Sequence, residues 1–336
     1  MLGRALLPVL SDARVICLVH RAPLNVAKVM CLQGDVSTRW LGLSRAAFDE
    51  LAAQIDCIIH SAAVTQFRVP AEETRRVNVD GTRHVIELAH RAQAPLYHVS
   101  TAFVGTQSRS EQPPTAYEMS KLESDAVLRE SGVPHVVLRP SLVIGDSVTG
   151  RIAQFQGIYL VLGLYLKGLL PVVPALPDTY ADFIPQDVVA NAVATLIRND
   201  VRRGEYWLTL GDQALTIGEV VELCAALAEE IDGLPRLPVR LVAPDTFERL
   251  IKPAFLPVFP DRARRLLERA SELTRYMNLE QRFPSSLSAL HRQFGMPPLP
   301  DPRSSLMRSL AHWAESTGFS VGPSARARLF SDGVAA

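Results

Sequence analysis

The sequence predicts an α/β protein built on a doubly wound parallel sheet. Through residues 1–150, short and continuous apolar segments alternate with amphipathic segments, and the connections between them are short. The apolar segments lack the alternation of polar and apolar residues that is typical of a strand with one solvent-exposed face. Strands that are apolar on both faces need helices on both faces, as in a parallel sheet with crossover helices.

The individual elements follow from local patterns. Strands are expected where β-branched and apolar residues run together between turn residues, at residues 14–19, 26–32, 56–60, 95–101 and 135–138. Helices are expected where apolar residues recur every three or four positions, at residues 2–10, 48–55, 79–91 and 114–129.

Beyond about residue 150 the pattern loosens, and prolines cluster at residues 171–177 and 297–302. We expect residues 151–320 to form a smaller C-terminal substrate-binding lobe that also returns elements to the sheet. A late strand at residues 205–209 precedes an amphipathic helix at 217–231. Residues 321–336 are expected to be a disordered tail.

One apolar stretch, residues 157–166, is interrupted by Lys167 and Pro171 and is too short to span a membrane. A helix that lines an apolar pocket is favoured, and contact with a membrane surface is the alternative. Such a pocket could form part of a channel for an acyl chain.

Composition excludes several classes of function. The 336 residues are 48% hydrophobic, and Lys+Arg and Asp+Glu balance at 35 each, so no global basic field favours nucleic acid. The four Cys lack C-x-x-C spacing and are expected to be buried free thiols in a reducing compartment. The eight His form no metal-binding pattern, and no signal peptide is evident, so we expect a cytoplasmic protein without a metal site.

Tyr117 and Lys121 are the candidate catalytic residues. They stand four residues apart in a segment expected to be helical, so both lie on one face, one turn apart. A nearby ammonium stabilises the phenolate and lowers the phenol pKa from about 10 towards the working pH, which suits a proton donor to a carbonyl under reduction. Ser100 and Thr101 end an apolar strand and add hydroxyl groups. A packed aromatic residue and ordinary strand-end capping are the structural alternatives.

Several further motifs occur in a fixed order. They are Gly34-Asp35-Val36, Leu41-Gly42-Leu43-Ser44, Ile58-Ile59-His60-Ser61-Ala62-Ala63, Asn78-Val79-Asp80-Gly81-Thr82, His98-Val99-Ser100-Thr101-Ala102, Tyr117-x-x-Ser120-Lys121, Leu138-Arg139-Pro140-Ser141-Leu142-Val143-Ile144-Gly145-Asp146 and Phe183-Ile184-Pro185-Gln186-Asp187. Together they resemble the extended short-chain dehydrogenase/reductase superfamily, and within it the thioester-reductase and fatty-acyl reductase, or male sterility, branch. The resemblance covers roughly residues 2–320 and implies a Rossmann-like, NAD(P)-binding region at residues 1–150.

The start of the chain departs from this family. Such folds open with a strand and a glycine-rich turn whose amides approach the pyrophosphate of the dinucleotide. Here Gly3 would be the last glycine of that turn, and the first strand would be missing. Because that strand is central, its loss would leave buried groups unpaired at about 1–3 kcal/mol each. We hypothesise that Met1 is an internal residue of a longer protein, and a degenerate, non-catalytic relative is the alternative.

The resemblance also assigns roles. Tyr117 is the expected acid, Lys121 tunes it and holds the nicotinamide ribose, and Thr101 contacts the substrate carbonyl, with Ser100 as the fallback. The remaining cofactor-binding positions that the resemblance implies are Gly3 at the pyrophosphate turn, Asp35 and Val36 beside the adenine, Ser61, Ala62 and Ala63 beneath the cofactor, Asn78 at a helix start, and Arg139, Pro140 and Ser141 near the nicotinamide. The role of Asn78 is expected to be mainly structural, as an N-cap.

His20 and Arg21 follow the second strand of the resembled fold. An acidic residue there would bind the ribose 2′-hydroxyl, whereas an Arg can accommodate a 2′-phosphate. We therefore expect NADP (NADPH) as cofactor, with NAD left open. Which of the two residues contacts the phosphate is also open, and a solvated basic turn is the structural alternative.

The function expected from these motifs is NADPH-dependent reduction of an acyl thioester, bound to CoA or to a carrier, to an aldehyde or alcohol. Another extended short-chain dehydrogenase, acting on sterols, ketones or nucleotide sugars, is the first alternative. A non-catalytic dinucleotide-binding protein is the second. The sequence leaves open whether the chain forms a homodimer.

Overall fold

The structure, a computed structural model, describes residues 1–21, 24, 26, 29–66, 69–104, 113–155, 157–169, 172–232 and 240–330. Of the expected features, parts of the 26–32 strand, Pro171, and residues 331–336 of the tail lie outside the described residues.

The first half of the chain contains the expected helices and strands, with ends that differ by a few residues. Its elements are α1 (Leu2–Val9), β1 (Ile16–Val19), β2 (Met30–Gln33), α2 (Arg45–Ala52), β3 (Ile58–His60), α3 (Ala71–Arg75), the π-helical segment η2 (Arg76–Asp80), α4 (Gly81–Ala92), β4 (Leu96–Val99), α5 (Ala116–Glu130), β5 (His135–Pro140) and β6 (Leu142–Ile144).

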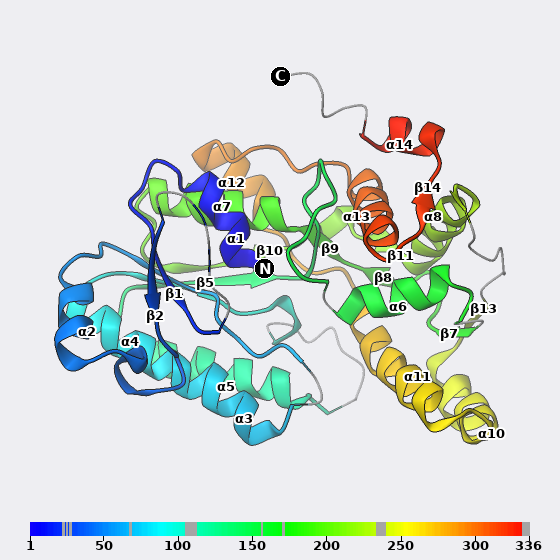
Figure 1. Ribbon diagram of the computed structural model, residues 1–336, viewed down its shortest axis with the longest axis horizontal. Helices are drawn as coiled ribbons and strands as arrows, with labels where there is room; N and C mark the ends of the chain where they lie inside the picture. The colour runs from blue at the N-terminus through cyan, green and yellow to red at the C-terminus, as the bar shows by residue number, and fades with distance from the viewer. Residues whose placement is uncertain are drawn as a thin grey trace.

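The main sheet has four parallel strands in the order β10-β5-β4-β3, where β10 (Gly204–Leu208) returns from the second half of the chain. Helices α2, α4 and α5 cover one face, and α1, α7 (Gln186–Arg198) and α12 (Leu287–Phe294) cover the other (Figure 1). Neighbouring strand residues point to opposite faces, so Leu96 packs with the first set of helices and Tyr97 with the second. The predicted doubly wound parallel α/β fold is confirmed.

Strands β1 and β2 form a separate parallel pair. Among the described residues, β1 pairs with β2 and β3 pairs with β4, so the sheet is divided between β1 and β3. Both strands nevertheless border the same core, because Ile16 and Ile58 pack into one cluster. The division lies where the resembled strand order places its first strand.

The second half adds a helical lobe beside the sheet (Figure 1). Its core is built mainly by α6 (Gly157–Leu166), α8 (Ile217–Glu229), α11 (Asp261–Thr274) and α13 (Pro302–Ser316). Its remaining elements include β7 (Val172–Pro174), β8 (Tyr180–Ala181), β9 (Phe183–Pro185), β11 (Leu215–Thr216), β12 (Ile231–Asp232), β13 (Arg240–Val242), α9 (Pro244–Thr246), η5 (Phe247–Ile251), α10 (Lys252–Phe255), η7 (Arg275–Met277), β14 (Ser320–Val321) and α14 (Pro323–Phe330).

Two expectations about this architecture are wrong. The tail is ordered as β14 and α14 up to Phe330, because Val321 and Ala325 bury their side chains in the core of the lobe, which composition alone could not show. The four Cys are free, but Cys31 is exposed and Cys17 and Cys57 are half-buried. The reason is that β2 exposes most of its residues to solvent, so an apolar strand sequence did not ensure burial.

Helix α6 is buried on nearly every side, and no helix in the described part of the chain is long and apolar enough to cross a membrane. With α8 and η7 it surrounds an apolar cavity of about 30 Å³, whose lining includes Leu162, Cys224 and Met277. This agrees with a pocket-lining helix, although the space is no larger than a small chemical group needs.

Asp182, between β8 and β9, is a buried junction of sheet and lobe. Its carboxylate accepts hydrogen bonds from the Ser141 hydroxyl and from the Leu210 amide, at 2.9–3.0 Å for the latter. Burial raises its pKa to about 6, and these hydrogen bonds oppose the rise.

Gly163→Ala should destabilise the protein. Alanine favours a helix over glycine by about 1 kcal/mol, but a Cβ at this position in α6 would overlap the Trp313 ring, and overpacking costs about 1–3 kcal/mol. The free energy of unfolding, measured with urea, should fall. Gly3→Ala in α1 is the matched control, because its Cβ would meet nothing within 4 Å, and it should leave stability unchanged or higher. A stabilised Gly163→Ala variant would contradict the packing described here.

Asp182 should make the protein less stable as pH rises. Its folded pKa of about 6 lies above the ordinary aspartate pKa of 3.8, so its contribution to stability is full below pH 3.8 and is lost as pH rises through 6. The loss amounts to about 3 kcal/mol at 1.36 kcal/mol per pKa unit. Urea unfolding between pH 4 and 7 should therefore show the stability difference between Asp182→Asn and the parent shifting in favour of the variant. A difference independent of pH would refute this origin.

Candidate active site

Helix α5 begins with a capping box that fixes its first turn. The Thr115 hydroxyl accepts a hydrogen bond from the Glu118 amide at 3.2 Å, and the Glu118 carboxylate accepts one from the Thr115 amide at 2.7 Å. The Tyr276 hydroxyl of η7 lies 3.1 Å from the Thr115 hydroxyl, which ties the lobe to the start of this helix. Tyr117, half-buried, is the second residue of the helix and therefore has a well-defined direction.

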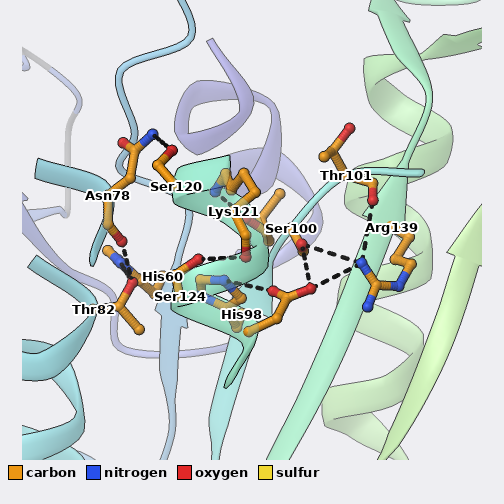
Figure 2. A network of polar contacts seen from close by, with 12 residues as sticks. His60, Asn78, Thr82, His98, Ser100, Thr101, Ser120, Lys121, Ser124 and Arg139 are labelled. Carbon is orange, nitrogen blue, oxygen red and sulfur yellow. Dashed lines mark hydrogen bonds and ion pairs between the residues drawn. The ribbon is translucent and has the colours of Figure 1, made fainter. Parts of the chain in front are cut away.

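Lys121 lies one helical turn after Tyr117, on the same face of α5, as the spacing predicts. Its side chain is only 4% exposed, and its ammonium donates a hydrogen bond to the Val99 carbonyl of β4 at 2.9 Å (Figure 2). Burial lowers its pKa to about 8, and the negative charge of Asp125 opposes that shift. The ammonium form therefore predominates at neutral pH.

Ser100 and Thr101 follow β4 at the carboxyl end of the sheet, and both are buried. The Ser100 hydroxyl donates to Asp125 at 3.0 Å, so it turns towards the protein interior (Figure 2). The Thr101 hydroxyl accepts a long hydrogen bond, 3.4 Å, from the Phe103 amide. Of the two hydroxyls, that of Thr101 makes the longer and therefore weaker hydrogen bond.

Asn78 does not act as an N-cap, so that predicted role is wrong. It lies inside the π-helical segment η2, and α4 begins after Asp80 without a side-chain cap. Its side chain instead bonds the backbone of Val64 in both directions, at 2.8 and 3.0 Å, and the Ser120 hydroxyl at 2.9 Å. Asn78 thus ties the segment after β3 to α5, and a π-helical turn at such a place is typical of functional sites.

Arg139 and the two residues after it make internal contacts. The Arg139 guanidinium donates to Glu205 at 2.6 Å and lies 3.0 Å from the Asp125 carboxylate. Pro140 is buried at the end of β5, and Ser141 bonds Asp182. The predicted contacts of these residues with a nicotinamide stay predictions.

The residues predicted to bind the nucleotide end of the cofactor lie at the carboxyl ends of β1 and β2. His20 Nε2 lies 3.4 Å from the Asp35 carboxylate, and Arg21 is exposed beside it. Burial by itself would raise the pKa of Asp35. Hydrogen bonds from Ser37 and the positive charges of His20 and Arg76 outweigh that effect, so the pKa of Asp35 lies below its usual value. Arg76 on η2, which sequence reasoning missed, therefore adds positive charge to this end of the site.

The other predicted cofactor contacts lie along the same edge. Val36 packs against Gly81, and Ser61, Ala62 and Ala63 leave the carboxyl end of β3, where open α/β sheets bind their ligands. At the N-terminus of α1, no side chain caps the helix, and a Cβ on Gly3 would meet nothing within 4 Å. Uncapped amides beside open space fit a phosphate group, so the residues present fit a dinucleotide.

Sequence reasoning missed the groups beneath Lys121. They are His60 on β3, His98 on β4 and Asp125 on α5, all buried. The two imidazole rings lie 5.5 Å apart, and burial lowers the pKa of both, so both are neutral at neutral pH. A signal did exist for Asp125, because it follows Lys121 by four residues and shares its helix face.

Comparison with known proteins identifies the chain's relatives. The male sterility protein family matches residues 12–193. Fusarin C synthetase of Gibberella moniliformis (strain M3125 / FGSC 7600) is 27% identical over 238 residues, which are 62% of this chain and 6% of that protein. A putative fatty acyl-CoA reductase of Drosophila melanogaster is 26% identical over 213 residues, 51% of this chain and 41% of that protein.

Among solved structures, the terminal R domain from the myxalamid PKS-NRPS biosynthetic pathway superposes with a TM-score of 0.76 at 25% identity, covering 94% of this chain and 88% of that one. The chain thus spans less than half the length of the two curated relatives and nearly all of this isolated domain. The family match covers more than half of the described fold, including β1 to β9 and α5. The chain therefore belongs to the male sterility protein family, whose relatives are NAD(P)-dependent reductases of the extended short-chain dehydrogenase/reductase type.

Proposed function

We propose that this protein is an NADPH-dependent reductase of acyl thioesters. The observation that carries the proposal is a buried ammonium, Lys121, held one helical turn from Tyr117 at the carboxyl end of a parallel sheet. Thr101 follows the neighbouring strand β4 by two residues, so an acid, a cation and a second hydroxyl are expected to lie together. That set matches the needs of carbonyl reduction, in which negative charge develops on the carbonyl oxygen.

Each residue has a distinct task in this proposal. When bound, NADPH supplies the hydride that adds to the thioester carbonyl carbon. The Thr101 and Tyr117 hydroxyls donate hydrogen bonds to the carbonyl oxygen and stabilise the charge that forms there. The Lys121 cation favours the ionised form of the phenol and holds the nicotinamide ribose. Breaking the C–S bond then releases a thiol and the aldehyde, and one proton is consumed overall.

The substrate class rests on the relatives and on the lobe. The printed names describe synthetases, an R domain of a PKS-NRPS pathway and a putative fatty acyl-CoA reductase. An acyl group on CoA or on a carrier protein is the substrate type common to such names. The apolar side chains around α6 and η7 favour an apolar substrate group, because Met277 is one of them while Tyr276, the residue before, contacts the start of α5.

Tyr117→Phe should abolish the activity. Loss of the proton donor should lower kcat by about 10²- to 10⁴-fold. NADPH oxidation with a panel of acyl-CoA thioesters measures the rate, and the affinity for NADPH should be unchanged. Tyr206→Phe on β10, a half-buried tyrosine outside the site, is the matched control and should keep the parental rate.

Three other outcomes would change the assignment. A Tyr117→Phe variant as fast as the parent would remove the proposed chemistry. Turnover of a sterol or nucleotide sugar in place of every thioester would favour another extended dehydrogenase, and NADPH binding without any turnover would favour a non-catalytic protein.

The basic residues after β1 should set the cofactor preference. Replacing His20 and Arg21 together by Ser removes the groups proposed to meet the 2′-phosphate, and hydrogen bonds to charged groups contribute about 1.5–3 kcal/mol. The KM for NADPH should rise by about 10- to 100-fold while the KM for NADH stays constant. Arg14→Ser, before the same strand and bonded to Gln54, is the control. Equal effects on both cofactors would contradict recognition of a 2′-phosphate.

A further inference from the structure

A group of charged and titratable side chains is buried beneath the proposed site. Its members in the described residues are His60, His98, Lys121, Asp125 and Arg139, and each is at most 5% exposed. They come from β3, β4, α5 and β5, so four elements converge on one polar space (Figure 2). Buried charges are costly unless they are paired, so this group needs a physical account.

Asp125 is the centre of the group. One carboxylate oxygen, Oδ2, accepts from the Ser100 hydroxyl at 3.0 Å and lies 3.0 Å from Arg139 Nη1. The other, Oδ1, lies 3.5 Å from His98 Nε2. Arg139 in turn donates to the Thr101 carbonyl and the Ser100 hydroxyl, each at 3.3 Å. The Ser100–Thr101 step is therefore held directly by the carboxylate and indirectly through the guanidinium.

The electrostatic balance also depends on Asp125. Lys121 and Arg139 are buried cations, and Glu205, which pairs with Arg139, has a side chain that is 46% exposed. Asp125 is the carboxylate of this group, and it lies one turn after Lys121 on the same face of α5, buried like Lys121. Its negative charge opposes the effect of burial on the Lys121 ammonium, whereas burial keeps His60 and His98 neutral at neutral pH. Asn78 and Ser120, which are hydrogen-bonded to each other, are polar but uncharged.

We propose that Asp125 is a positioning residue of this site, which fixes Ser100 and Thr101 on β4 and supplies the negative charge that keeps the Lys121 side chain an ammonium ion. The proposal rests on the proposed function for its catalytic consequence, but its structural part can be tested without any turnover. Asp125 touches neither substrate nor cofactor in this scheme and acts through Lys121 and Thr101.

The first test measures Lys121 itself. The chain has 4 Lys (Lys28, Lys121, Lys167 and Lys252), so a protein labelled with ¹³C at lysine Cε gives an NMR spectrum simple enough to follow, and Lys121→Arg assigns the signal. In the parent, Lys121 should titrate near pH 8. In Asp125→Asn its midpoint should fall by about one pH unit or more, because the anion that favoured the ammonium is gone. Lys167 and Lys252 should not move.

The matched control is Glu123→Gln. Glu123 is a partly exposed residue on the same helix, paired with Arg75 and outside the buried group. Its replacement removes one negative charge at a similar position in the sequence and should leave the Lys121 midpoint in place. Equal shifts in the two variants, or none in Asp125→Asn, would overturn the proposal.

The second test follows the rate. The basic limb of the pH–rate profile for NADPH oxidation should move to lower pH in Asp125→Asn by the same amount as the NMR midpoint. Asp125→Glu keeps the charge but moves the carboxylate, so its basic limb should stay in place while kcat falls by about 10- to 100-fold through misplaced hydroxyls. A parental kcat in Asp125→Glu would contradict the positioning role, even if Asp125→Asn failed to fold.

The two levels of the assignment can fail separately. An inactive Tyr117→Phe variant together with a parental Lys121 midpoint in Asp125→Asn would leave the proposed function standing and remove only this inference. An active Tyr117→Phe variant with a shifted midpoint would do the reverse.

Discussion

An ammonium ion in the protein interior constrains everything around it. Lys121 is almost fully buried, and burial works against its charge. The charge is retained because the Val99 carbonyl accepts its hydrogen bond and Asp125 faces it from the next helical turn. The Val99 hydrogen bond depends on α5 lying against β4, so the charge state of one side chain is tied to the docking of the helix on the sheet.

The surroundings of α5 serve that docking. A capping box fixes its start, Asn78 ties its Ser120 to the segment after β3, and the Arg139–Asp125 pair ties it to β5. The lobe contributes through Tyr276, which contacts Thr115 and packs edge-on against Phe103 after β4. The lobe is therefore joined to the first turn of α5 and to the segment after β4 by directly packed side chains.

The proposed nucleotide-binding end of the site and the proposed catalytic end are built differently. The groups near Lys121 are buried and hydrogen-bonded, whereas His20, Arg21 and Arg76 lie towards solvent around Asp35. Exposed charges in water interact weakly with one another and gain strength when a ligand displaces the water. Such an arrangement suits a site that binds a charged cofactor reversibly beside a chemical centre that must stay in place.

The sequence by itself determined the fold class, the helix that carries Tyr117 and Lys121, and the strand that leads into Ser100 and Thr101. These follow from patterns within one element, namely apolar periodicity, four-residue spacing and the Thr115–Glu118 cap, and such patterns are local. Only the tertiary structure decided that Asn78 bonds Val64 and Ser120, that Arg139 turns to Asp125, that Cys31 is exposed and that α14 packs on the lobe. Each of these depends on atoms from segments distant in the chain, because burial and pairing of polar groups are set by which elements meet.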